Sequence, residues 1–254
     1  MNTQSEKCQT LAALHASQDI WMIPNPWDVG SAKDLEALGF KALATSSAAF
    51  AHTLGKKDGE VSIEEKLTHC EALSKNTTVP LHVDFEDGFS HEPLKVAANI
   101  RRLVETGVAG CSIEDFSRTQ AKVFDFTLAV ERVQAAAEVI AGFEMPFQLT
   151  ARAENLLRKH ADIDDTIKRL QAFANAGAHV LYAPGLATLE QIKLISNNTD
   201  KPLNVLSPFL PGVSLQALGE AGVTRVSFGS ALQNNMRSNF LAGMKELLSS
   251  GLAS

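Results

Sequence analysis

The chain has 254 residues, 45% of them hydrophobic and 20% charged, which is ordinary for a packed globular protein with a large core. Its formal net charge of -6 at pH 7, without a clustered Lys/Arg stripe, argues against nucleic acid as a partner. The sequence shows neither a secretory leader nor a run of about 18 apolar residues, so we expect a cytoplasmic protein with no membrane partner.

The predicted elements begin with a helix from about Gln4 to Ser17. A repeated unit follows, made of a short apolar run, a polar or glycine-containing loop and an amphipathic stretch. The runs, each short enough to be a buried strand, are eight in number: IWMIPN from Ile20, KALATS from Lys41, PLHVDF from Pro80, AGCSIED from Ala109, PFQLTAR from Pro146, AHVLYAP from Ala178, PLNVLS from Pro202 and VTRVSFG from Val223. Helical patterns between and after them occupy residues 31–39, 91–107, 127–142, 162–177, 188–197 and 230–250.

Alternating strands and helices predict parallel strands joined by helical crossovers. Eight such units in 254 residues match the size of a (β/α)8 barrel, whereas a doubly wound open sheet needs a reversal of strand order that a sequence does not reveal. No linker-like change in composition interrupts the repeat. We therefore predict an α/β fold, with residues 1–254 forming one (β/α)8 TIM-barrel domain.

Polar side chains gather on one face of three consecutive predicted strands. Because side chains alternate along a strand, that face carries His82 with Asp84, Ser112 with Glu114, and Gln148 with Thr150 and Arg152. Asp84, Glu114 and Arg152 fall at the C-terminal ends of their strands, where barrel enzymes carry their active sites. Polar groups are costly to bury unless they are paired or bind a metal, so this convergence is the main functional signal.

Carboxylates are ligands that Mg²⁺ or Mn²⁺ prefers, and the planar guanidinium of Arg152 suits a carboxylate or a phosphonate. Plainer interpretations stay open, because Glu86 and Asp87 could cap the next helix and Arg152 could be a structural ion-pair partner of Glu114. We interpret His82 as a hydrogen-bonded core residue. Five other histidines are expected at the surface: His52, His69, His91, His160 and His179.

Four segments, in order, resemble the isocitrate lyase and phosphoenolpyruvate mutase superfamily: IPNPWDVGSAKDLEALGFKALATSSAAFAHTLGKKDG, HVDFEDGF, CSIEDF and LTARAENL. The resemblance spans nearly the whole predicted barrel. It implies a (β/α)8 fold with bound Mg²⁺. It also implies a homo-oligomer, a dimer of dimers, in which the C-terminal helix is exchanged between barrels.

The resemblance implies roles for individual residues. Asp84 matches the family's direct Mg²⁺ ligand, and Glu86 stands where the family has a second aspartate near the metal. Ser46, flanked by Thr45 and Ser47, matches the serine that holds the substrate carboxylate. The implied site comprises Asp84, Glu86 and Glu114 at the metal, Thr45, Ser46, Ser47 and Arg152 at the substrate, and Asp58, Glu114 and Arg152 as catalytic residues.

One loop departs from the resemblance. Isocitrate and 2-methylisocitrate lyases carry a Lys-Lys/Arg-Cys-Gly-His loop after strand four, whereas the stretch here reads EDFSRTQAKVFDF. It has neither cysteine nor histidine, so the general acid of those lyases is absent from it and 2-methylisocitrate lyase is the disfavoured alternative. The three cysteines, Cys8, Cys70 and Cys111, are too few and too widely spaced for a disulfide framework or a zinc site.

Two functions of different classes follow. The leading hypothesis is a Mg²⁺-dependent enzyme, resembling oxaloacetate decarboxylase or a phosphonopyruvate hydrolase or mutase, that cleaves or rearranges a C–C or P–C bond next to a 2-oxo acid through an enolate. The alternative is a non-catalytic protein that binds an oxo acid or oxalate on the same metal scaffold.

Overall fold

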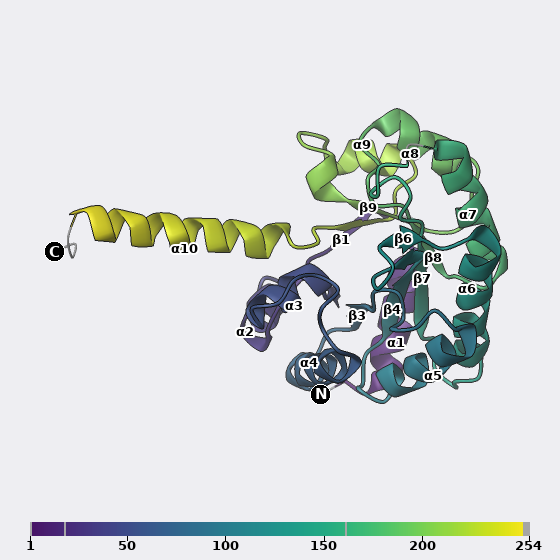
Figure 1. The fold of residues 1–254 in the computed structure, drawn as a ribbon, viewed down its shortest axis with the longest axis horizontal. Coiled ribbons are helices and arrows are strands. Elements are labelled where there is room, and N and C mark those ends of the chain that lie inside the picture. Colours follow the sequence, from purple (N-terminus) through teal and green to yellow (C-terminus); the bar gives the residue numbers. More distant parts are fainter. Residues whose placement is uncertain (1, 18, 161, 251–254) are drawn as a thin grey trace.

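Eight parallel strands form one nearly closed sheet in the computed structural model, which describes residues 2–17, 19–160 and 162–250 (Figure 1). The strand order is β1-β10-β9-β8-β7-β4-β3-β2. The strands are β1 (Trp21–Ile23), β2 (Leu43–Ala44), β3 (Leu81–Asp84), β4 (Gly110–Glu114), β7 (Gln148–Arg152), β8 (Val180–Tyr182), β9 (Leu203–Leu206) and β10 (Arg225–Ser227). Each lies within one of the eight predicted runs, so the predicted barrel is confirmed.

A backbone hydrogen bond links the two edge strands of the sheet, β1 and β2. Ala44 of β2 donates its N–H to the carbonyl of Pro24, just after β1, at 2.9 Å. Because both strands are short, this bond takes the place of a longer ladder and brings the loop after β2 next to the loop after β1.

Helices surround the sheet (Figure 1). They are α1 (Gln4–Ala16), α2 (Val29–Ala37), α3 (Ser47–Thr53), α4 (Ile63–Asn76), α5 (Pro93–Val104), α6 (Phe126–Ala141), α7 (Ile163–Asn175), α8 (Leu189–Ser196), α9 (Leu215–Glu220) and α10 (Ala231–Ser250). The sequence patterns had not singled out α3, α4 and α9. Nor had they singled out a small antiparallel hairpin, β5 (Phe116–Ser117) with β6 (Lys122–Val123), in the loop that departs from the resemblance.

Helix α4 places a charged side chain, Lys66, in the interior of the protein. It begins at Ser62, whose hydroxyl accepts the N–H of Glu65 while the Glu65 carboxylate accepts the N–H of Ser62, a capping box that fixes where the helix starts. From this start Lys66 and Leu73 fall on one face of the helix, and both are fully buried. The start of α4 therefore aims Lys66 at the end of β3.

The same face of α4 corrects one prediction. His69, expected at the surface, is buried and stacks on the Phe50 ring with centroids 3.7 Å apart, and its Nε2 lies 3.0 Å from the carbonyl oxygen of Trp27. Burial, together with the charge of Lys66, lowers the pKa of His69 to about 4. The expectation failed because it rested on the absence of metal-ligand spacing, which says nothing about burial.

Helix α10 projects away from the barrel (Figure 1). Its large apolar side chains recur at helical spacing and are exposed: Met236, Phe240, Leu241, Met244, Leu247 and Leu248. An exposed apolar surface of this kind is typical of an interaction site. Among the described residues, no helix combines the length and apolar character that crossing a membrane requires.

Gly110 offers a test of the barrel packing. It is paired with His82 on β3 and Gln148 on β7, and a Cβ added to it would lie 2.7 Å from the carbonyl oxygen of Gln148 and 3.0 Å from Cδ2 of His82. Gly110→Ala is therefore expected to lower the free energy of unfolding by about 1–3 kcal/mol in urea titrations. Gly243→Ala is the control, because nothing lies within 4 Å of a Cβ there. Equal effects of the two substitutions would contradict this packing.

Candidate active site

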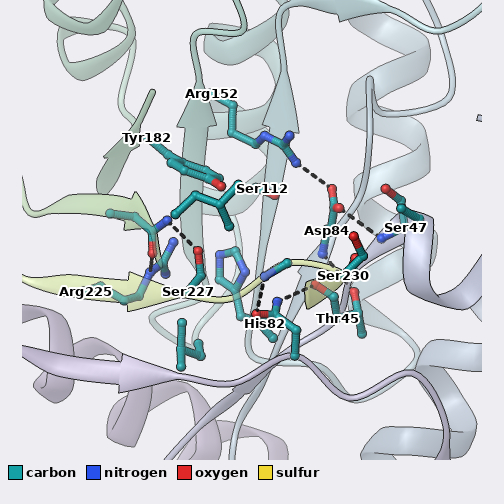
Figure 2. Close-up of a pocket in the computed structure, with 18 of the residues that line it drawn as sticks. Thr45, Ser47, His82, Asp84, Ser112, Arg152, Tyr182, Arg225, Ser227 and Ser230 are labelled. Carbon is teal, nitrogen blue, oxygen red and sulfur yellow. Dashed lines mark hydrogen bonds and ion pairs between the residues drawn. The ribbon is translucent and has the colours of Figure 1, made fainter. Parts of the chain in front are cut away.

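A cavity of about 180 Å³ opens at the C-terminal ends of the strands (Figure 2). Six of the residues predicted for the site line it: Thr45, Ser46, Ser47, Asp58, Asp84 and Arg152. The other two, Glu86 and Glu114, are not among the lining residues and lie buried behind it. The cavity thus brings together the predicted substrate-binding residues, the predicted direct metal ligand and Asp58, one of the predicted catalytic residues.

Asp84, the last residue of β3, is held from two sides. Its Oδ1 accepts a hydrogen bond from Nη1 of Arg152 at 2.9 Å, and its Oδ2 accepts the backbone N–H of Ser47 at 3.0 Å. Its own N–H is donated to the hydroxyl of Thr45 at 2.9 Å. Burial disfavours the charged carboxylate, but Arg152 and Lys66 outweigh that effect, so the pKa of Asp84 lies below its ordinary value and the group is ionised at neutral pH.

Arg152 contacts three carboxylates at once. Its guanidinium nitrogens lie 2.9 Å from Asp84, 3.1 Å from Glu114 and 2.7 Å from Glu154. The structural ion pair with Glu114, left open by the sequence, is therefore present, and Arg152 also lines the cavity. Burial raises the pKa of Glu114 well above its usual range because it removes water from the charged form, and the negative charge of the nearby Glu154 raises it further.

Glu86 sits in a strained loop between two cations. Its backbone is left-handed, with φ of 50°, a conformation that costs a residue with a Cβ and persists where the surroundings enforce it. Arg118 Nη1 donates to its Oε2 at 2.7 Å, and Lys66 Nζ lies 3.6 Å from its Oε1. Lys66 also donates to the carbonyl of Asp84 at 3.2 Å. Burial raises the pKa of Glu86 in spite of both cations.

Asp87, whose charge the sequence did not explain, ties the β5–β6 hairpin to the loop after β3. Its carboxylate accepts the backbone N–H groups of Phe89 at 3.1 Å and Arg118 at 3.2 Å. Arg118 in turn donates to the carbonyl of Val61 at 3.0 Å, and its guanidinium lies over the Phe89 ring. The hairpin is thus fixed to the residues beside the cavity.

The chemistry of the donors around Asp84 fits a hard divalent cation. The Asp84 side chain is 16% exposed toward the cavity, Asp58 lines the same cavity, and Oε1 of Glu86 is buried without a hydrogen-bond partner. The described residues contain no group of three or more His, Cys, Asp or Glu side chains placed to hold a metal. Mg²⁺ does not require such a cage, because it usually takes one or two carboxylates and completes its shell with water and substrate.

Polar residues that the sequence reasoning did not select line the part of the cavity that we call its floor: Asn204, Arg225 and Ser227. Figure 2 shows Arg225 and Ser227 there, on the same side of the cavity as Tyr182. Asn204 sits on β9, and Arg225 and Ser227 are two residues apart on β10. The alternation of side chains that pointed to β3, β4 and β7 is also present in the sequences of β9 and β10. Applied to all eight predicted strands, it would have identified these three residues as well.

None of the three cysteines lies at this cavity. Cys8, Cys70 and Cys111 are fully buried in the core, and burial raises the pKa of the Cys8 and Cys70 thiols to about 12. A thiol held so firmly in its protonated form, away from the cavity, is a poor proton donor for a reaction there.

The chain matches the family model for phosphoenolpyruvate phosphomutase over residues 11–248. A crystal structure from Burkholderia cenocepacia J2315, assigned to a lyase or mutase, is 38% identical, covers 98% of this chain and 90% of that chain, and superposes with a TM-score of 0.94.

Two named enzymes are also similar to the chain. The oxaloacetate decarboxylase of Paraburkholderia xenovorans is 29% identical over 210 residues, 78% of this chain and 64% of that enzyme. The 2-methylisocitrate lyase of Halalkalibacterium halodurans is 25% identical over 237 residues, 91% of this chain and 74% of that enzyme.

The buried pair of Lys66 and Glu86 is open to a double-mutant test. Glu86→Gln is expected to lower the free energy of unfolding by about 3–5 kcal/mol, because it leaves the Lys66 ammonium buried without a carboxylate. Lys66→Met should cost less than Glu86→Gln, because Arg118 still pairs with Glu86 at 2.7 Å, and the double variant should lose less than the two single losses together. Glu71→Gln, which breaks an exposed pair with Lys75, is the control. Strict additivity in urea titrations would refute the coupling.

Proposed function

The chain belongs to the phosphoenolpyruvate phosphomutase family, and on that premise we propose that it is a Mg²⁺- or Mn²⁺-dependent enzyme acting on a 2-oxo acid. It cleaves or rearranges a C–C or P–C bond next to the oxo group through an enolate. One observation carries the proposal: Asp84, Arg152 and the Thr45–Ser47 segment line a single cavity at the C-terminal ends of the strands. The similarity to lyases, oxaloacetate decarboxylase among them, supports the reaction class.

Asp84 would hold the metal directly, while Asp58, Glu86 and Glu114 would orient its water ligands. When bound, the cation supplies Lewis-acid polarisation of the substrate's oxo and carboxylate oxygens. Asp84 is suited to this role because its charge is secured by Arg152 and by the N–H of Ser47, so its carboxylate does not turn away from the cavity.

Arg152 and the Thr45–Ser47 segment would hold the anionic end of the substrate. The guanidinium of Arg152 is kept in place by Glu114 and Glu154, neither of which lines the cavity, so its orientation is set before a substrate arrives. Fixed donors of this kind stabilise charge as it develops on an enolate oxygen. A stabilisation of about 4 kcal/mol corresponds to roughly a thousandfold in rate.

The cysteine-free hairpin and the buried thiols support a reaction that needs no cysteine acid. This separates the proposal from 2-methylisocitrate lyase chemistry, for which the resemblance implies a thiol at the cavity. Decarboxylation of a short oxo diacid and hydrolysis or rearrangement of phosphonopyruvate remain within the proposal.

The purified protein should turn over oxaloacetate or phosphonopyruvate, and not 2-methylisocitrate, in the presence of Mg²⁺. EDTA should abolish the activity, and Mg²⁺ or Mn²⁺ should restore it. Asp84→Asn is expected to lower kcat/KM by about 10²–10³-fold, because the negative charge that would hold the metal is lost. Asp34→Asn, at an exposed position on α2, is the control.

Two outcomes would contradict part or all of the proposed function. Turnover of 2-methylisocitrate at enzymatic rates would overturn the argument from cysteine. A rise in melting temperature with Mg²⁺ and oxalate, without turnover of any of the three substrates, would favour the non-catalytic binding protein.

We also propose that the protein is a homo-oligomer, a dimer of dimers, held together through α10. The exposed apolar side chains of that helix support this, because burying them against a second copy removes apolar surface from water. Gln233, at the start of α10, is buried, and its Nε2 lies 2.8 Å from Nδ1 of His52, so the helix leaves the barrel from a fixed base.

Light scattering should therefore report a mass above that of one chain. Phe240→Glu, which places a charge in the middle of the apolar face, should shift the protein toward the monomer. Lys245→Ala, on the same helix, should leave the mass unchanged. A monomeric wild-type protein would refute the proposal.

A further inference from the structure

Arg225 carries a buried charge on the cavity floor without a carboxylate beside it. Its side chain is 3% exposed, and its guanidinium donates to Oδ1 of Asn204 at 2.7 Å and to the hydroxyl of Thr150 at 3.2 Å. Its third partner is Nε2 of His15, at 2.9 Å. Burial and the neighbouring Arg225 lower the pKa of His15 to about 3, so all three partners are neutral at physiological pH.

The two arginines of the cavity differ in this respect. Arg152 contacts three carboxylates, so its charge is already balanced within the protein before a ligand binds. No ion pair among the described residues includes Arg225. A buried cation without a counter-charge is costly, which makes Arg225 the stronger site for an incoming anion.

Arg225 lies one layer below Arg152 in the barrel. Its partner Thr150 precedes Arg152 by two residues on β7, and residues two apart on a strand are separated by about 7 Å along it. Figure 2 shows Tyr182 near Arg152 and Ser227 near Arg225, so polar side chains continue from one level of the cavity to the other.

We propose that Arg225 binds a second anionic group of the substrate, so that the cavity selects a short 2-oxo dicarboxylate over a 2-oxo monocarboxylate. This rests on the proposed function, which places the 2-oxo acid end at Asp84 and Arg152. The distal carboxylate reaches the floor, where the guanidinium has N–H groups beyond those given to Asn204, Thr150 and His15. The hydroxyl of Ser227, which also lines the floor, adds a further polar contact.

The test uses pairs of acids with the same chain length that differ only in a terminal carboxylate or methyl group. The pairs are 2-oxoglutarate with 2-oxovalerate, and oxaloacetate with 2-oxobutyrate, titrated calorimetrically into the full-length protein with Mg²⁺. The wild type should bind the dicarboxylate of at least one pair about tenfold more tightly, or better, which is the effect of one charged hydrogen-bonded contact. Arg225→Gln should bring that ratio close to one while leaving the monocarboxylate Kd within about twofold.

Two further variants keep the result interpretable. Arg225→Lys retains the charge and should keep part of the preference, even if Arg225→Gln fails to fold. Arg101→Gln removes an exposed arginine on α5 and should behave as the wild type does.

Equal binding within both pairs by the wild type, or a preference that survives in Arg225→Gln, would overturn the role of Arg225 and leave the proposed function intact. Failure of the wild type to bind any of the four acids with Mg²⁺ would instead overturn the proposed function, and this inference with it.

Discussion

The candidate site depends on the contact of one buried guanidinium with three carboxylates. Glu114 and Arg152 are paired in register on β4 and β7, and Asp84 is paired with Ser112 of β4, so the three charges sit close together at the ends of adjacent strands. Removing Arg152 would leave these buried carboxylates without the cation that they share, which costs several kcal/mol. The barrel thus fixes Arg152 before any ligand binds, and Arg152 fixes Asp84.

A second set of charges connects this centre to the parts of the chain around it. Glu86 is reached by Lys66 from α4 and by Arg118 from the β5–β6 hairpin, while Asp87 accepts the N–H of Arg118. The loop after β3, the hairpin and α4 are therefore held by the same two acidic residues. Any change in charge next to Asp84 acts on the hairpin through these contacts, because buried charges interact in a medium of low dielectric.

The sequence predicted the fold more fully than it predicted the site. Period-two and helical patterns depend on neighbouring residues, so all eight strands could be located, and the polar face of β3, β4 and β7 led to Asp84 and Arg152. Lys66 and Arg118 could not be found in this way. Each meets Glu86 from a distant segment, and their patterns are those of an ordinary helix and an ordinary loop. Arg225, in contrast, could have been identified from the alternation of side chains along β10.

Charge balance gives an independent reason to expect an anionic ligand of more than one charge. The charged residues lining the cavity are Asp58, Asp84, Arg152 and Arg225, so its formal charge is zero. A divalent cation at Asp84 raises this to plus two, and an excess of charge beside largely buried groups is costly unless a ligand balances it. A dianionic substrate restores neutrality and a monoanion does not. Arg225, at the far end from Asp84, then decides where the second negative charge lies, because it is the lining cation with no carboxylate partner among the described residues.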